Sequence, residues 1–316
     1  MKIVASFVPS EELQKDFKGE FPNIEIEYYK GIKNAEKAYI DAEVFLTYGE
    51  DLTPEYIELA KNLKWIMVLS AGLERMPFAA CAEKGILVTN ARGIHKIPMA
   101  EFTLGAMLEH VKQRQQLREN ELNKKWDRKL PMGELSGKTI MVLGIGAIGG
   151  EIARLAQAFG MKVIGVNRSG SANEFADITV KLDKLEEHLS KPDFIVSVLP
   201  STSETKYLLN EDHFRQMKKS AVFINIGRGD LVSEEILLKA LEEEFISHAY
   251  LDVFENEPLK PEHPFWEMKN VTVTPHLSSI TKKYQPRGFE IFKHNLHTYI
   301  NNGNDFINVI DLERGY

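Results

Sequence analysis

Three side chains capable of acid–base and anion-binding chemistry each follow a short apolar run. Arg228 follows AVFINIG, Glu257 follows AYLDVFEN, and His276 follows VTVTP. A glycine loop at 144–149 follows the apolar run TIMVL in the same way. In an open parallel sheet, ligands bind in the crevice outside the carboxyl ends of the strands. The sequence therefore predicts that these four features meet at one edge of a sheet.

An arginine, a glutamate and a histidine together suit hydride transfer to the carbonyl of a 2-keto acid. Arg228 can bind the substrate carboxylate and carbonyl as a bidentate donor. His276 can protonate the carbonyl oxygen during reduction and act as the base in the reverse direction. Glu257, hydrogen-bonded to the imidazole, would favour its charged form. Taken singly, Arg228 could instead be a structural salt-bridge partner, Glu257 a surface loop acid, and His276 a histidine that only makes structural hydrogen bonds. Polar residues of this kind are common in loops.

The glycine loop reads Gly144-x-Gly146-x-x-Gly149 and lies between a predicted strand and the predicted helix EIARLAQAFG. Gly144 would allow a tight turn, Gly146 a close approach of backbone to a pyrophosphate, and Gly149 close packing of helix on strand. The helix N-terminus would supply free N–H groups to the phosphates. This context favours a dinucleotide site over a plain strand–helix turn.

The next strand, KVIGV, ends at Asn167, Arg168 and Ser169, and no carboxylate follows until Glu174. NAD-selective sites usually carry an acidic residue here, and an arginine accommodates a 2′-phosphate. A guanidinium beside a hydroxyl suits phosphate. The sequence therefore predicts a preference for NADP(H), with NAD(H) possible. The alternative is that Arg168 is a solvated loop residue.

The elements that must position these groups alternate between strand and helix signals. The predicted strands before residue 97 are 2–7, 24–29, 42–48, 64–70 and 85–90, with helical segments such as 10–18 and 53–62 between them. The alternation is typical of a parallel, doubly wound sheet. A long helical stretch at 97–120 interrupts it, and a loop with Trp126 follows.

The same alternation restarts at TIMVL. The predicted elements are the strands TIMVL, KVIGV, ADITV, DFIVSV, AVFINI, SHAYLDVF and VTVTP and helices near 148–159, 211–217 and 233–244, with a last helix at 284–302. We therefore expect an α/β protein with two doubly wound parallel-sheet lobes and a cleft between them. The expected domains are 1–97 plus 284–316 for the substrate and 98–283 for the dinucleotide.

Composition narrows the class of protein. The 316 residues carry a formal net charge of −7, which argues against nucleic acid as a partner. No apolar stretch approaches about 18 residues, so no membrane span is expected. The lone Cys81 excludes an internal disulfide framework and a cysteine-based zinc site. His294 and His297 share a helical face without an evident third ligand, so no metal is expected. We expect a cytoplasmic enzyme or binding protein.

Five segments in order resemble the D-isomer-specific 2-hydroxyacid dehydrogenases along nearly the whole chain. They are LGIGAIGGEIA (143–153), LPSTSET (199–205), NIGRGDLV (225–232), LDVFENEPL (251–259) and TPHLSS (274–279). The resemblance implies that Arg228 binds the substrate, that Glu257 rather than Glu255 tunes the histidine, and that His276 is the acid/base. The missing acidic residue after KVIGV makes the chain more similar to NADP-using glyoxylate and hydroxypyruvate reductases.

The resemblance also implies which loops hold the ligands. Backbone amides of Ser70, Ala71 and Gly72 would bind the substrate carboxylate beside Arg228 and His276, since a glycine-containing turn can present successive N–H groups to an anion. Asp252 would lie near the nicotinamide. The positions assigned to the cofactor are Gly144, Gly146, Ala147, Ile148, Gly149, Asn167, Arg168, Ser169, Leu199, Pro200, Thr205, Ile226 and Asp252.

Family membership would imply a Rossmann cofactor lobe, a flavodoxin-like substrate lobe and a C-terminal helix that returns to the latter. It would also imply a homodimer formed through the cofactor lobe, and a small 2-keto or 2-hydroxy acid as substrate. Tyr48, Gly49, Arg75, Met76 and Trp266 are candidates for the wall of the side-chain pocket. Two alternatives remain open: a cofactor-sensing interaction protein similar to the family's corepressors, and an NAD-dependent dehydrogenase of the phosphoglycerate type.

Overall fold

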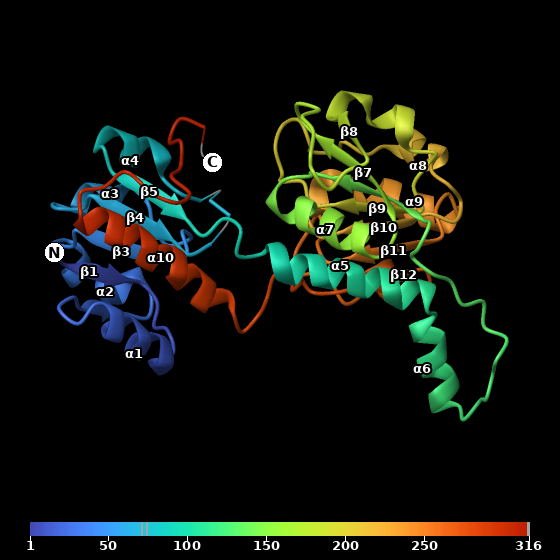
Figure 1. Cartoon of the computed structure of the whole chain (residues 1–316), viewed down its shortest axis with the longest axis horizontal. Coiled ribbons are helices and arrows are strands. Elements are labelled where there is room, and N and C mark those ends of the chain that lie inside the picture. The colour runs from blue at the N-terminus through green and yellow to red at the C-terminus, as the bar shows by residue number, and fades with distance from the viewer. Residues whose placement is uncertain (71, 74, 315–316) are drawn as a thin grey trace. The chain divides into compact units, whose positions relative to one another are not determined.

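The computed structural model describes residues 1–70, 72–73 and 75–314. The chain forms two compact units: Met1–His95 with Thr281–Tyr316 is unit 1, and Lys96–Ile280 is unit 2 (Figure 1). The boundaries expected from the sequence, at 97 and 284, lie close to these.

Unit 1 contains a five-stranded parallel sheet in the order β2-β1-β3-β4-β5, the order found in flavodoxin-like sheets. Its strands are β1 (Ile3–Ala5), β2 (Ile26–Tyr28), β3 (Val44–Thr47), β4 (Trp65–Val68) and β5 (Leu87–Asn90). The three central strands β1, β3 and β4 are buried along their whole length, as expected of a parallel sheet covered on both faces.

Helices cover both faces of this sheet. One apolar cluster packs α2, α3 and α4 against side chains such as Phe45 and Ile66, and a second packs α1 and α10 against Leu46 and Met67. The helices are α1 (Glu11–Glu20), α2 (Ile32–Tyr39), α3 (Pro54–Leu59), α4 (Phe78–Glu83) and α10 (Tyr284–Ile300). The C-terminal helix α10 thus belongs to unit 1, where the Phe292 ring stacks on that of Trp65 at 5.5 Å.

Unit 2 contains a seven-stranded parallel sheet in the order β12-β11-β10-β9-β6-β7-β8. Its strands are β6 (Thr139–Leu143), β7 (Lys162–Asn167), β8 (Ile178–Lys181), β9 (Phe194–Ser197), β10 (Val222–Asn225), β11 (His248–Leu251) and β12 (Val271–Val273). Starting from β6, the chain first builds outward through β7 and β8 and then returns to add β9 on the other side. The strand order therefore reverses between β6 and β9, which is where open α/β sheets of the Rossmann type bind ligands.

Two layers of helices enclose this second sheet. α5 and α7 pack with Ile140, Val142 and Val196 on one face, while α8, α9 and the short helix η1 pack with Met141, Ile195 and their neighbours on the other. The helices are α5 (Lys96–Val111), α6 (Arg114–Leu122), α7 (Ala147–Ala158), α8 (Glu211–Gln216) and α9 (Glu234–Glu242), with 3₁₀ turns η1 (Leu182–His188), η2 (Gly229–Leu231) and η3 (Pro264–Trp266). Among the residues described, no helix has the length and apolar character needed to cross a membrane.

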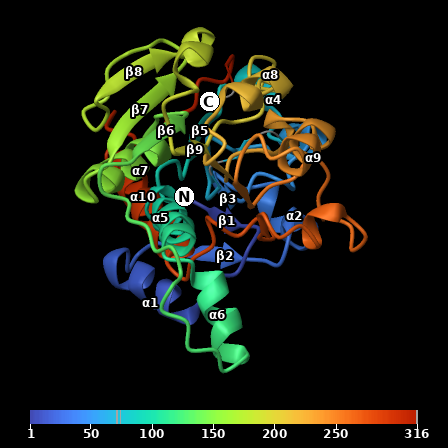
Figure 2. The ribbon, with the colours of Figure 1, turned by 90° about the vertical axis from the view of Figure 1, so that its right-hand side faces the viewer.

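The prediction of one continuous helix over 97–120 was wrong. The helix breaks after Val111, and Gln113 adopts the left-handed conformation with φ 49° before α6 begins. Two hydrogen bonds close the base of the excursion that follows, from Gly133 N to Val111 O at 2.7 Å and from Lys112 Nζ to Gly133 O at 2.8 Å. We call residues 112–133 the arm. Figures 1 and 2 both show α6 and the segment after it extending away from the sheet of unit 2.

Unit 1 also contains α2 and α4, which were not among the helical segments named from the sequence. The buried residues of α2 are Ile32, Ala35, Ala38 and Tyr39, a spacing typical of one helical face. Thr53, expected to cap α3, occupies the N-cap position without a side-chain cap hydrogen bond, and Pro54 follows at the first helical position.

Candidate active site

His276 and Glu257 form a hydrogen-bonded pair. Nδ1 of His276 lies 2.8 Å from Oε2 of Glu257, and the other oxygen, Oε1, accepts a hydrogen bond of 3.0 Å from the backbone N–H of Phe254. The loops that carry the pair follow β12 and β11, which are neighbours in the sheet. Both carboxylate oxygens are thus engaged, and the imidazole is oriented with Nδ1 toward the acid and Nε2 away from it.

Asp252 holds the turn that presents His276. Its side chain is 1% exposed, and Oδ1 accepts hydrogen bonds from Thr274 Oγ1 at 2.6 Å and Leu277 N at 3.0 Å. Oδ2 accepts from Ser278 N at 2.9 Å, and the backbone oxygen of Asp252 accepts from His276 N at 2.8 Å. This set of bonds keeps His276 at φ 51°, a left-handed conformation rare for a residue other than glycine.

Arg228 follows β10, the neighbour of β11, and its Nη1 donates to the backbone oxygen of Gly227 at 2.9 Å. The buried amide of Asn225 shapes this loop: its Nδ2 donates to Arg228 O at 2.9 Å and its Oδ1 accepts from Gly227 N at 3.1 Å. Gly229 has no room for a side chain, since an added Cβ would lie 1.9 Å from the carbonyl carbon of Phe254. The Arg228 loop therefore packs directly on the backbone that supports Glu257.

The glycine loop joins β6 to α7. Gly144 has φ 97°, and an added Cβ on Gly149 would lie 2.3 Å from the Gly144 oxygen, so the turn requires the first glycine and the packing requires the third. An added Cβ on Gly146 would meet no protein atom within 4 Å. Ala147 and Ile148 are the first two residues of the 12-residue helix α7, where backbone N–H groups lack intrahelical partners.

The loop after β9 lies against both of these loops. An added Cβ on Gly227, which precedes Arg228, would lie 2.7 Å from Leu199 O, and one on Gly144 would lie 3.2 Å from the Leu199 side chain. Thr205 Oγ1 donates to Pro200 O at 2.6 Å, which closes the loop on itself. Ile226, the last candidate for the cofactor in this region, is buried after β10.

The end of β7 forms a polar turn. Asn167 Oδ1 accepts a hydrogen bond of 2.6 Å from Gly170 N, and Nδ2 donates to Ser171 O at 2.9 Å. The Ser169 and Ser171 hydroxyls contact each other, and Arg168 is exposed on the same turn. The turn thus gathers two hydroxyls and a guanidinium where an NAD site would carry a carboxylate.

The expected carboxylate loop belongs to unit 1 and follows β4. Its Gly72 N–H donates to Ser70 Oγ at 3.1 Å, and Ala71 lies outside the described residues. Of the expected pocket-wall residues, Tyr48 accepts a hydrogen bond of 2.8 Å from Gln285 Nε2, and Met76 is buried. Trp266, in unit 2, is 49% exposed.

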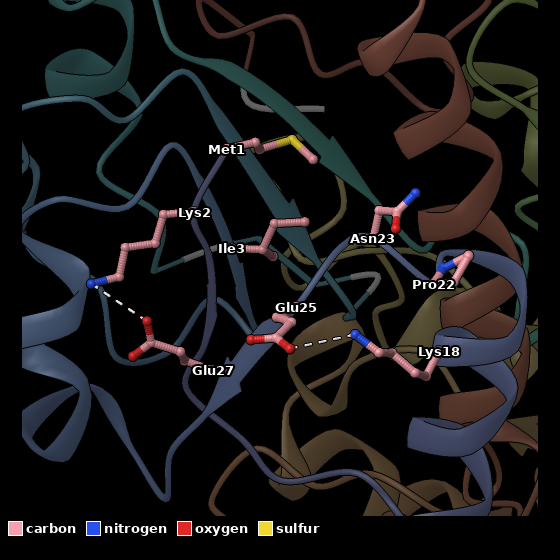
Figure 3. Close-up of a pocket in the computed structure, with 8 residues that line it drawn as sticks. All are labelled: Met1, Lys2, Ile3, Lys18, Pro22, Asn23, Glu25 and Glu27. Atoms are coloured by element: carbon pink, nitrogen blue, oxygen red, sulfur yellow. Dashed lines mark hydrogen bonds and ion pairs between the residues drawn. The ribbon is translucent and has the colours of Figure 1, made fainter.

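A hollow in unit 1 is lined by none of the predicted site residues. It lies at the amino ends of β1 and β2, where Lys2 and Lys18 pair with Glu27 and Glu25 at 3.5 Å each (Figure 3). Because parallel sheets bind ligands at their carboxyl ends, this hollow is at the wrong end of its sheet for catalysis.

Several supporting residues were missed from the sequence. Asn225, Gly229 and Thr274 each hold a loop that carries a predicted catalytic residue. The available signal was their position, because each lies within three residues of Arg228 or His276. Nothing in the sequence indicated that Asp252 would bond to the turn after β12.

The chain is similar in sequence to one protein family and to several known enzymes. The family model described as "D-isomer specific 2-hydroxyacid dehydrogenase, NAD binding domain" matches residues 104–278. A D-3-phosphoglycerate dehydrogenase from Methanocaldococcus jannaschii is 37% identical over 78% of the chain, and the match spans 47%, about half, of that relative's length. A glyoxylate reductase from Thermofilum pendens is 35% identical over 78% of this chain and 75% of its own.

The fold of this chain is also similar to that of a solved enzyme structure. An NADPH-dependent glyoxylate/hydroxypyruvate reductase from Sinorhizobium meliloti, in complex with NADP and sulfate, has a TM-score of 0.80 and 27% identity, with all of both chains covered.

Proposed function

The chain belongs to the D-isomer specific 2-hydroxyacid dehydrogenase family, and we propose that it is an NADP(H)-preferring reductase of small 2-keto acids that forms the D-2-hydroxy acid. The observation that carries this proposal is the 2.8 Å hydrogen bond between His276 Nδ1 and Glu257 Oε2, one strand away from Arg228 in the same sheet. The three residues follow the neighbouring strands β10, β11 and β12 of the sheet that also carries the glycine loop, which supports a shared role.

The proposed chemistry assigns one role to each of the three residues. Arg228 binds the carboxylate and carbonyl oxygens of the keto acid. His276, held by Glu257 through Nδ1, donates the Nε2 proton to the carbonyl oxygen and takes it back in the oxidative direction. Glu257 stabilises the imidazolium and, once the Nε2 proton has left, keeps the proton of the neutral ring on Nδ1. NADP(H), when bound, supplies or accepts the hydride at the carbonyl carbon.

The residues present fit a dinucleotide. The open space around Gly146 and the N–H groups at the start of α7 suit a pyrophosphate. Leu199, Pro200, Thr205 and Ile226 are proposed to line the cofactor at the switch between β6 and β9. Asn167, Arg168 and Ser169 are proposed to bind the 2′-phosphate, because the turn offers donors and no carboxylate.

The two units are proposed to divide the work. Unit 2 would bind the cofactor and supply the catalytic residues. Unit 1 would bind the substrate carboxylate through the Ser70–Gly72 loop and contribute Tyr48 to the side-chain pocket. Asp252, proposed from the resemblance to lie near the nicotinamide, has three of its acceptor positions already used by the 274–278 turn.

A substrate panel tests the proposal. We expect turnover of glyoxylate, hydroxypyruvate or pyruvate with NADPH, and a loss of about 10²- to 10⁴-fold in kcat for His276→Ala with cofactor affinity retained. Failure of every 2-keto acid with both cofactors, or a His276→Ala variant that keeps most of its kcat, would refute it.

The similarity to phosphoglycerate dehydrogenases favours a second candidate, an NAD-dependent enzyme acting on a phosphorylated hydroxy acid. The same panel separates the two if it includes 3-phosphohydroxypyruvate with NADH. Preference for that pair over the small keto acids with NADPH would establish the second candidate.

A further inference from the structure

The loop after β9 is tied at two points to the loop that carries Arg228. Ser201 Oγ donates to Asp230 Oδ2 at 2.6 Å, and the backbone N–H of Tyr207 donates to Asp230 O at 2.7 Å. Asp230 lies two residues after Arg228. The segment 201–207 is therefore fastened at its beginning and at its end to one residue of the neighbouring loop.

Tyr207 extends this connection to a third loop. Its backbone has φ 52°, a left-handed conformation that tyrosine rarely adopts. In this conformation the phenol donates a hydrogen bond to Oε1 of Glu255, whose other oxygen accepts from the backbone N–H of Glu234 at 3.2 Å, the first residue of α9. An unfavourable backbone conformation that persists indicates that its surroundings hold it in place.

Glu255 lies two residues before Glu257, in the loop whose backbone supports the catalytic pair. Phe254 N–H donates to Glu257 Oε1 at 3.0 Å, and the Phe254–Glu255 peptide is the group against which Gly229 packs without room for a Cβ. A shift of Glu255 would therefore move the donor that orients Glu257. Glu257 in turn orients His276.

We propose that Tyr207 and Glu255 are positioning residues, and that Ser201, Tyr207, Asp230 and Glu255 form a brace between three loops. The brace joins the loop proposed to line the cofactor to the loops that carry Arg228 and Glu257. It keeps Glu257 at hydrogen-bond distance from His276. The inference rests on the proposed function, since it assigns the brace to the proton-transfer pair.

The test is a double-mutant cycle between Tyr207→Phe and Glu257→Gln, measured as kcat for 2-keto acid reduction with NADPH. Tyr207→Phe removes one hydroxyl, and we expect kcat to fall roughly 3- to 30-fold, the range of one hydrogen bond to a charged group partly exposed to water. KM for the keto acid and Kd for NADPH should stay close to those of the wild type. The solvent isotope effect on kcat should rise, because proton transfer becomes more limiting.

The cycle distinguishes positioning from general loosening. If the brace acts through Glu257, the double variant is no slower than Glu257→Gln alone, because the group that Tyr207 positions is already gone. Multiplicative losses in kcat, or a Tyr207→Phe variant with unchanged kcat, would overturn the brace. If Glu257→Gln itself leaves kcat unchanged, both the acid–base pair and the brace are wrong.

Two further variants are measured beside these, a second one that lacks the phenol and a control in unit 1. Tyr207→Gly also removes the phenol, and glycine adopts φ 52° without strain. This variant can therefore be measured even if Tyr207→Phe folds poorly. It should show the same loss of kcat and the same non-additivity with Glu257→Gln, and normal kcat in it would overturn the brace. Tyr29→Phe is the matched control: Tyr29 also donates to a glutamate, Glu27, at 2.7 Å, but in unit 1. It should leave kcat unchanged, and an equal loss there would remove the specific role of Tyr207.

Discussion

At the scale of single residues, position relative to a strand end matters as much as residue type. Glu255 and Glu257 are two residues apart, yet one carboxylate bonds Tyr207 and the start of α9, while the other bonds His276. Side chains two residues apart in an extended segment point to the same side. The bend of the chain at residues 255–258 therefore sends the two carboxylates to different partners. The geometry of the His276–Glu257 pair therefore depends on backbone groups such as Phe254 N–H that carry no chemical signal in the sequence.

The proposed cofactor preference depends on Arg168. Arg168→Ala should lower kcat/KM with NADPH about 10- to 100-fold, the value of one or two charge-assisted hydrogen bonds to phosphate, and leave the NADH value nearly unchanged. Steady-state kinetics with both cofactors measure this. Arg314→Ala in unit 1, which removes a guanidinium paired with Asp311, is the control and should change neither. Equal losses with both cofactors in Arg168→Ala would exclude a role in binding the 2′-phosphate.

At the scale of elements, α5 packs on β11 through two histidines. The rings of His110 and His248 lie 5.5 Å apart, and His248 Nε2 lies 2.9 Å from Thr272 Oγ1. Burial, and then repulsion from His110, lowers the pKa of His248 to about 4. Burial, with a smaller contribution from Lys138, also lowers the pKa of His110. Burial at this contact therefore favours the neutral form of both histidines.

This contact should make stability pH-dependent. In the unfolded chain, a histidine has a pKa of about 6.5, whereas folded His248 has a pKa of about 4. Between these two pH values the unfolded state therefore binds one more proton than the folded state. The free energy of unfolding should fall by about 2 kcal/mol from pH 7 to pH 5, since each unit of pKa difference contributes about 1.4 kcal/mol. Urea denaturation at several pH values measures this. His248→Gln should reduce the slope and His188→Gln should not; a slope unchanged in His248→Gln would contradict the assignment.

The sequence predicts elements well where local and tertiary signals agree. The strands of the parallel sheets are runs of Val, Ile and aromatic residues, and their ends located Arg228, Glu257 and His276 correctly at one sheet edge. The break between α5 and α6 was missed because Lys112 and Gln113 are good helix formers. Long-range bonds to Gly133 decide the break, and the sequence pattern does not contain them. The left-handed conformation of Tyr207 was also missed, because it depends on long-range bonds to Asp230 and Glu255.

At the scale of the whole molecule, the arm carries three large apolar side chains that are exposed in the chain. Trp126 is 92% exposed, Leu122 66% and Met132 53%, and exposed apolar groups of this size mark interaction sites. A second copy of the chain is the proposed partner, because the family resemblance implies a homodimer through the cofactor lobe.

This assignment predicts that Trp126→Asp weakens the dimer. A buried tryptophan is a common anchor of interfaces, and its loss typically costs about 2 kcal/mol or more, at least a 30-fold rise in the dissociation constant. Analytical ultracentrifugation over a range of concentrations measures it. Leu59→Asp, at a 46% exposed position in unit 1, should leave the association unchanged. A wild-type chain that sediments as a monomer at all concentrations would refute the homodimer.

The closed base of the arm has a consequence for engineering the chain. Because Val111 and Gly133 are already joined by a 2.7 Å hydrogen bond, the two ends of the excursion meet side by side. A short glycine linker could replace everything between them, or the corresponding segment of a relative could be spliced in, without moving a strand of unit 2. The proposed dimer contact could thus be removed or exchanged while the proposed active site stays as it is.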